Sequence, residues 1–178
     1  KAGHDLAMSV NISANNLREP DFPLFVQRLL TASRTPNGKL ALELTETAMM
    51  LDPNNSLRAL RSLDVTGIPL SIDDFGSGYS SLSYIKQLPA REIKIDRSLI
   101  TDLAEHADDR VIVETTIAMC HNLGYTVVAE GVEDEATLDM LTAMGCDLVQ
   151  GYVLTPPLPL PELLIWLDRH GARQRASG

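Results

Sequence analysis

Short apolar segments alternate with longer amphipathic segments along most of the chain. In six segments, apolar and polar residues alternate or form a brief apolar run, which predicts strands at residues 6–13, 39–46, 68–73, 92–96, 125–130 and 146–150. Between and after them, apolar residues recur at helical spacing, which predicts helices at residues 20–34, 54–63, 81–87, 108–123, 133–144 and 161–170. Four prolines within residues 155–161 predict an irregular connection there.

This alternation predicts parallel β-α units. Each expected strand has polar residues at or near its C-terminal end: Asn11, Glu43 with Glu46, Asp73 with Asp74, Lys94, Glu130 and Gln150. In a parallel barrel all strand ends gather on one face, whereas in an open doubly wound sheet only those near the switch point do so. Polar ends on six strands therefore favour an α/β fold of the (β/α)8, TIM-barrel type. Such a barrel usually takes about 250 residues, so the sequence lacks about two β-α units.

The composition is that of one ordinary globular domain, with 178 residues, 44% of them hydrophobic and 22% charged. The formal net charge of −9 argues against duplex nucleic acid bound through a basic face. No apolar run approaches the ~20 residues of a membrane span, so we expect no membrane contact by this segment. Cys120 and Cys146 lie far apart, which suggests buried, reduced thiols and a cytoplasmic protein. The first residue, Lys1, suggests a segment cut from a larger protein, whose other domains could anchor it to a membrane.

The most informative stretch is Ser-Ile-Asp-Asp-Phe-Gly-Ser-Gly-Tyr at residues 71–79. Neighbouring strand residues point to opposite faces, so Asp73 and Asp74 can share one site only if the strand ends and the backbone begins to turn there. The two glycines permit such a turn. Adjacent carboxylates need a positive partner, and Mg²⁺ and Mn²⁺ prefer carboxylate oxygens. Two interpretations remain open here: a metal site, or an Asp-Asp turn that caps the next helix.

Other strand-end residues extend the metal hypothesis. Asn11, Glu43 and Asp73 can each offer an oxygen to one hard cation, and Asp74 can reach a second. Two such ions about 3.5–4 Å apart can clamp the attacking and leaving oxygens of a phosphodiester and generate hydroxide at neutral pH. Glu130 and Gln150 would complete this set of strand-end residues, each as a metal ligand, a base or a water-positioning group.

Several of these residues have structural alternatives. Lys94 can steady the attacking water or a phosphate oxygen, or it can simply pair with Asp96 or Glu43. Asn11 can cap the turn that follows it. We expect Glu46 to anchor the glycine-containing loop, by accepting hydrogen bonds from its backbone N–H groups, and not to bind metal. The four histidines show no ligand spacing and are expected at the surface.

The order and spacing of six motifs resemble the EAL domain family. The motifs are SVNIS, LELTE, SIDDFGSGYSSL, KIDRSLI, VVAEGVE and QGY with its following prolines. The resemblance extends from about Leu6 to Trp166. Because that family comprises cyclic di-GMP phosphodiesterases on a (β/α)8-type barrel, the resemblance implies that residues 1–178 form the C-terminal three quarters of one such domain.

Position by position, the resemblance implies a two-metal site that holds Mg²⁺ or Mn²⁺. Asn11, Glu43 and Asp73 would ligate the first ion. Asp74 would ligate the second, with Glu130 nearby, and both are also candidate catalytic residues.

The resemblance assigns roles to the remaining motif positions as well. Lys94 would contact the catalytic water, and Gln150 and Glu133 would lie at the metal and substrate site. Glu46 would brace the loop at residues 75–79, whose anchoring positions are Phe75, Gly76 and Gly78.

The resemblance further implies linearisation of cyclic di-GMP to 5′-pGpG. It implies a homodimer with the central loop near its interface, and tethered GGDEF or sensory domains in a bacterial cytoplasmic protein.

The chain departs from the family in one respect: the Glu-Ala-Leu signature is absent from the sequence. With it would go a metal-ligating Glu, a substrate-binding Arg and two β-α units, although the family positions that follow are intact. A barrel without two strands exposes sheet edges, so we expect preceding sequence or a swapped partner chain to supply them. A non-catalytic EAL-like module that binds cyclic di-GMP or a protein is the alternative function. An unrelated metal-dependent barrel hydrolase is a weaker one.

Overall fold

The computed structural model describes residues 4, 6–36, 38–78 and 81–176, and contains one six-stranded parallel sheet. The strands are β1 (Met8–Asn11), β2 (Leu40–Thr45), β3 (Leu70–Phe75), β4 (Glu92–Ile95), β5 (Thr126–Glu130) and β6 (Leu148–Gln150). The helices are α1 (Ala14–Arg18), α2 (Phe22–Ser33), α3 (Glu46–Met50), α4 (Pro53–Asp64), α5 (Leu82–Ile85), α6 (Arg97–Ile100), α7 (Ala107–Asn122), α8 (Glu135–Ala143) and α9 (Leu160–Ala176).

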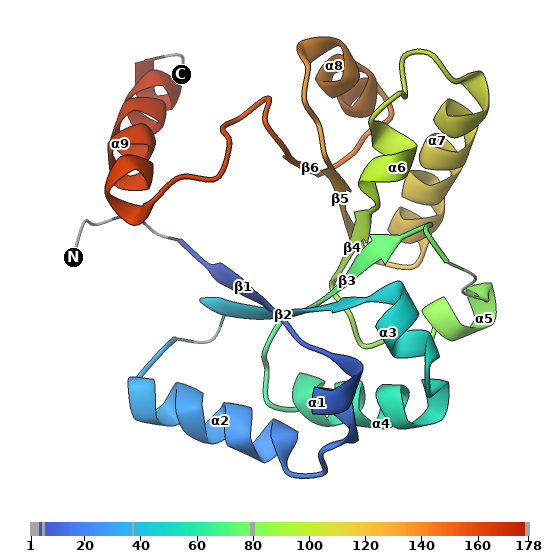
Figure 1. Ribbon diagram of the computed structural model, residues 1–178, viewed down its shortest axis with the longest axis vertical. Coiled ribbons are helices and arrows are strands. Elements are labelled where there is room, and N and C mark those ends of the chain that lie inside the picture. The colour runs from blue at the N-terminus through green and yellow to red at the C-terminus, as the bar shows by residue number, and fades with distance from the viewer. Residues whose placement is uncertain (1–3, 5, 37, 79–80, 177–178) are drawn as a thin grey trace.

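The strand order identifies a barrel-type winding. The strands follow one another in the sheet in the order of the chain, β1 to β6, and every neighbouring pair is parallel. A doubly wound sheet would reverse its strand order at a switch point. The sheet curls, with α2, α4, α7 and α8 around its outer side and α9 across its concave side (Figure 1). The predicted α/β barrel class is confirmed as an incompletely closed barrel.

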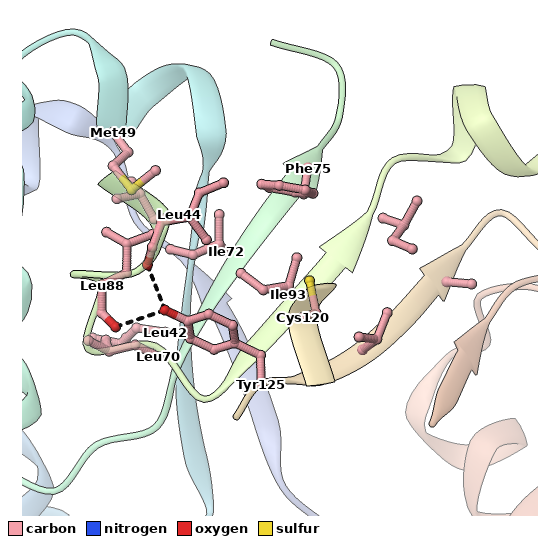
Figure 2. Packing of buried hydrophobic residues seen from close by; sticks show 14 of the residues in the cluster. Leu42, Leu44, Met49, Leu70, Ile72, Phe75, Leu88, Ile93, Cys120 and Tyr125 are labelled. Atoms are coloured by element: carbon pink, nitrogen blue, oxygen red, sulfur yellow. Dashed lines mark hydrogen bonds between the residues drawn. The ribbon is translucent and has the colours of Figure 1, made fainter. Parts of the chain in front are cut away.

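The main core lies between the outer face of the sheet and the helices α2, α4, α7 and α8. Leucine, isoleucine and valine side chains from β2 to β5 alternate with inward polar ones and are almost fully buried. Figure 2 shows this packing, with Tyr125 at its edge. The buried Tyr125 hydroxyl donates a hydrogen bond to the Ile85 carbonyl at 2.6 Å and approaches the Leu88 carbonyl at 3.2 Å. Tyr125 therefore ties the start of β5 to the last residue of α5 and to the segment that follows it.

All six strands appear where the sequence predicts them, but three short helices directly after strands were not predicted. These are α1, α3 and α6, of four or five residues each. Such helices are too short to show an apolar period of 3.6 residues. Each begins at a side-chain cap, from Ser13, Thr45 and Asp96 respectively, so capping is the sequence signal that remains.

Within the described residues, β1 and β6 each pair on one side only. Apolar side chains at these edges are consequently open to solvent: Met8 is 67% exposed and Leu148 is 51% exposed. Unpaired parallel edges of this kind are favourable places for another strand to add.

Candidate metal centre

The inner face of the sheet carries charged side chains at the C-terminal strand ends. On β2, Leu42 and Leu44 are buried against the helices, so Glu43 between them points to the inner face. The same alternation brings three further residues to this face at the ends of β3, β4 and β5, namely Asp73, Lys94 and Glu130. The barrel curvature then turns these side chains toward one another.

Lys94 lies at the centre of this group. Its side chain is 5% exposed, and its Nζ lies 3.3 Å from Glu43 Oε2, 3.1 Å from Asp73 Oδ1 and 2.5 Å from Glu130 Oε1. Burial alone would lower the pKa of Lys94, but the hydrogen bond and charge of Glu130, followed by the charges of Asp73 and Glu43, outweigh it and raise the pKa. Lys94 is therefore a cation. The three carboxylates around it include Glu43 but not Asp96.

A bulge in β3 brings Asp73 and Asp74 to the same site. The register between β3 and β4 shifts between Ile72 and Phe75, and Asp74 has a φ of 54°, in the left-handed region. The expectation that the strand ends at Asp73 and that glycines make the turn is therefore wrong, because β3 continues through Phe75 and Asp74 itself makes the turn. Aspartate tolerates this conformation better than most residues. Carboxylate oxygens of Asp73, Asp74 and Glu130 consequently lie within 4.8 Å of one another.

Asp96 is a further neighbour of this cluster, although the sequence suggests it only as a possible partner of Lys94. Its carboxylate caps α6 by accepting a hydrogen bond from the Ser98 N–H at 2.9 Å, and it also lies within hydrogen-bonding reach of Asp74. Burial, followed by the charges of Asp73 and Asp96, raises the pKa of Asp74. The sequence signal that could have placed Asp96 at this site is its position directly after β4, since β2, β3 and β5 also have acidic residues at or near their ends.

Glu46 joins α3 to the loop after β3. It is 1% exposed, and its Oε2 accepts a hydrogen bond from the Gly76 N–H at 2.9 Å. Phe75 is buried in the core, and Gly78 lies close enough that a Cβ there would be 3.1 Å from Glu46 Oε1. The four predicted anchoring residues thus lie together, while Tyr79 falls outside the described residues.

The remaining predicted residues surround the cluster. Asn11 ends β1 in register with Glu43 and is exposed. Gln150 ends β6 and Glu133 follows β5; both are exposed, and both line a cavity of about 440 Å³ that reaches Glu130. The structure therefore places these residues at the same end of the sheet, on its rim.

The donor set suits hard divalent cations. Glu43, Asp73 and Glu130 contact the ammonium of Lys94, and Asp74 lies beside Asp73 and Glu130, so four carboxyl groups share one cation in this cluster. Burial, opposed by Lys94 and reinforced by Asp73 and Asp74, raises the pKa of Glu130, as expected where anionic oxygens are crowded. Carboxylate oxygens are the preferred ligands of Mg²⁺, Mn²⁺ and Ca²⁺, so the residues present fit ions of this class.

The cysteines and histidines lie away from this centre. Both cysteines are free, but only Cys120 is buried; burial raises its pKa to about 11, while Cys146 is half-buried. His106 and His121 are exposed, whereas His4 and His170 are partly buried. In the residues that the structure describes, no helix combines the length and apolar character needed to cross a bilayer.

Comparison with known proteins identifies relatives whose similarity to this chain extends over all six strands. The family model described as EAL domain matches residues 1–157. The bifunctional diguanylate cyclase/cyclic di-GMP phosphodiesterase MucR of Pseudomonas aeruginosa is 43% identical over 163 residues, which are 91% of this chain and 24% of MucR. The chain thus spans about a quarter of the length of this curated relative.

Solved structures agree with this relationship. A cyclic di-GMP complex of the P. aeruginosa MucR phosphodiesterase superposes with a TM-score of 0.85 at 42% identity, over 90% of this chain and 66% of that one. A manganese and cyclic di-GMP complex of Klebsiella pneumoniae BlrP1 superposes with a TM-score of 0.79 at 32% identity, over 85% of this chain and 39% of that one. A calcium and cyclic di-GMP complex of BlrP1 matches equally well.

Proposed function

The chain belongs to the EAL domain family, and from that premise we propose that it forms the catalytic part of a metal-dependent phosphodiesterase that hydrolyses cyclic di-GMP to linear 5′-pGpG. The observation that carries this proposal is the cluster of four carboxylates at the C-terminal ends of the strands, three of which contact Lys94. Active sites of parallel barrels lie at this end. The cyclic di-GMP complexes of the related MucR and BlrP1 structures support the choice of substrate.

The ligand roles in this proposal are those that the family resemblance implies. In this proposal Asn11, Glu43 and Asp73 hold one Mg²⁺ or Mn²⁺ ion, and Asp74 with Glu130 holds a second. When bound, the two ions would supply a nucleophilic hydroxide at neutral pH and neutralise charge on the phosphodiester. The manganese complex of BlrP1 supports the choice of ion.

Lys94 acts as a hydrogen-bond donor in this scheme. Because its pKa is raised, the side chain keeps its proton and cannot serve as a general base at neutral pH. Its Nζ can orient the attacking water or a phosphate oxygen instead. Gln150 and Glu133, on the cavity beside Glu130, would contact the substrate.

Glu46 would hold the metal ligands in place. Its hydrogen bond to the Gly76 N–H fixes the residue that follows the bulge, and the bulge determines where Asp73 and Asp74 point. Such supporting hydrogen bonds tune affinity at metal sites.

We also propose how the functional protein is assembled. The open edges of β1 and β6 would be covered by further strands from residues outside this sequence or from a partner chain, which a stable, soluble monomer of this chain alone would contradict. A homodimer with the loop after β3 near its interface, a tethered diguanylate cyclase or sensory domain and a cytoplasmic location complete the proposal. The diguanylate cyclase activity in the name of MucR supports the tethered domain.

Metal binding and turnover can be tested together on the intact protein. The protein would first be stripped of metal with a chelator, and Mn²⁺ would then be added back and its binding measured by electron paramagnetic resonance. Cyclic di-GMP and pGpG would be separated by chromatography. We expect product only after Mn²⁺ or Mg²⁺ is restored, and reduced Mn²⁺ binding in Asp74→Asn. Binding of cyclic di-GMP without product under all metal conditions would instead favour a non-catalytic binding module.

A further inference from the structure

A cavity of about 440 Å³ lies beside the metal centre and reaches Glu130. It is lined by two glycines, Gly131 and Gly151, and by four residues with polar side chains, namely Arg97, Glu133, Gln150 and Tyr152. Of these four, Arg97 and Tyr152 have no role in the proposed function.

Neighbouring segments approach Gly131 and Gly151 so closely that neither position has room for a side chain. A Cβ on Gly131, whose φ is 72°, would lie 2.6 Å from Arg97 Cβ, and a Cβ on Gly151 would lie 2.0 Å from the Val132 carbonyl oxygen. The Val132 N–H in turn donates to the Gln150 carbonyl at 3.1 Å. The start of α6 is thus held against the segment that follows β5 (Figure 1). The base of the Arg97 side chain therefore lies against Gly131, the residue directly after Glu130.

The Arg97 guanidinium remains available to a ligand. Its side chain is 66% exposed, and its Nη2 lies 3.8 Å from Oε1 of Glu133, which is 54% exposed. A contact of this length between exposed groups is weak and leaves most donors of the guanidinium free. Tyr152, an aromatic residue that is 63% exposed, lines the same cavity.

We propose that Arg97 is a specificity-determining residue that recognises a guanine base of the substrate, an inference that rests on the proposed hydrolysis of cyclic di-GMP. A base suits the cavity better than a phosphate does. Two carboxylates, Glu130 and Glu133, line the cavity with Arg97 and would repel a second phosphate. Guanine is neutral and offers both acceptors and donors, as this mixture of side chains requires.

The donors and acceptors match guanine in detail. The fork of a guanidinium is complementary to the O6 and N7 acceptors of guanine, and a carboxylate such as Glu133 can accept from N–H groups at its other edge. Adenine presents an amino donor in place of O6, which would face the donors of Arg97. The Tyr152 ring provides a surface on which either base could stack, so it would add affinity without discrimination.

The test is calorimetric binding to the intact protein with Ca²⁺, using cyclic di-GMP and cyclic di-AMP as probes. Arg97→Ala should weaken cyclic di-GMP binding about ten- to a hundredfold and change cyclic di-AMP binding little, so that the preference for guanine collapses. Arg97→Lys keeps the charge but loses the fork, and it should not restore the preference. Arg58→Ala, which removes an exposed arginine of α4, is the matched control and should change neither affinity.

Several results would overturn the inference: an equal loss for both dinucleotides, full rescue by lysine, no loss, or a wild-type protein that binds neither probe. The first two would indicate a phosphate contact. Hydrolysis is measured separately, so a protein that turns over cyclic di-GMP without dependence on Arg97 refutes this inference alone. A protein whose binding depends on Arg97 but which releases no product refutes the proposed function alone.

Discussion

Replacing Lys94 by methionine should destabilise the metal-free protein. Methionine has a similar length and packs adaptably in buried places. It removes, however, the ammonium that lies between Glu43, Asp73 and Glu130. The three carboxylates, whose side chains are only 12%, 13% and 15% exposed, would then repel one another without compensation.

The size of the effect can be bounded from these contacts. One ion pair at about 3 Å is worth about 5 kcal/mol at an effective dielectric constant of about 20, before the cost of desolvation is subtracted. Removing one partner of a buried pair lowers the free energy of unfolding by about 3–5 kcal/mol. Because the carboxylates are partly exposed, we expect a loss at the lower end of this range, about 3 kcal/mol. Because the folded pKa of Lys94 is raised, this stabilisation is complete at neutral pH and is lost only as the pH rises from about 10.4 through the raised pKa.

Urea unfolding in the presence of a chelator is the appropriate assay, repeated after addition of Mn²⁺. Metal should stabilise Lys94→Met more than the wild type, since cations that bind the folded state replace the lost positive charge. Lys86→Met, at an exposed position, is the control and should change stability by less than about 0.5 kcal/mol. Adding Glu43→Gln to Lys94→Met should recover part of the loss. Equal stability of Lys94→Met and wild type in chelator would refute this account of the cluster.

Three further substitutions test other parts of the structure. Glu46→Ala, which removes the acceptor of the Gly76 N–H, should weaken Mn²⁺ affinity or turnover about 10- to 100-fold, and an unchanged affinity and rate would contradict the bracing role. Tyr125→Phe should lower the free energy of unfolding by about 1–2 kcal/mol in urea titrations, because buried carbonyls lose their donor. Asp147→Asn should lower stability at neutral pH, since the Val127 N–H and then His121 lower the pKa of Asp147. That difference should hold above the ordinary aspartate pKa of about 3.9 and shrink as the pH falls through the lowered folded pKa.

The sheet and its charged face could be predicted from local sequence patterns. Leu42 and Leu44 on either side of Glu43 specify both a strand and the face to which the carboxylate points. The same reasoning orients Lys94 and Glu130. Parallel strands place such ends together, so membership of one site followed from periodicity and topology alone.

The finer arrangement could not be predicted because it depends on contacts between distant segments. The left-handed backbone of Asp74 accompanies the shifted register between β3 and β4, which no local pattern in the sequence specifies. Asp74 also lies within hydrogen-bonding reach of Asp96, which follows β4. The approach of Arg97 to Gly131 joins the start of α6 to the segment after β5, and both residues line the cavity beside Glu130.

The most direct test of the central claim is the rate at which the intact protein and its Glu43→Gln variant convert cyclic di-GMP to pGpG in Mn²⁺. Glutamine has nearly the same shape as glutamate but removes one negative charge from the carboxylate cluster. We expect pGpG from the wild type and little or none from the variant at matched folded concentration. Turnover by the variant at the wild-type rate, or no product from the wild type with either Mn²⁺ or Mg²⁺, would contradict the central claim.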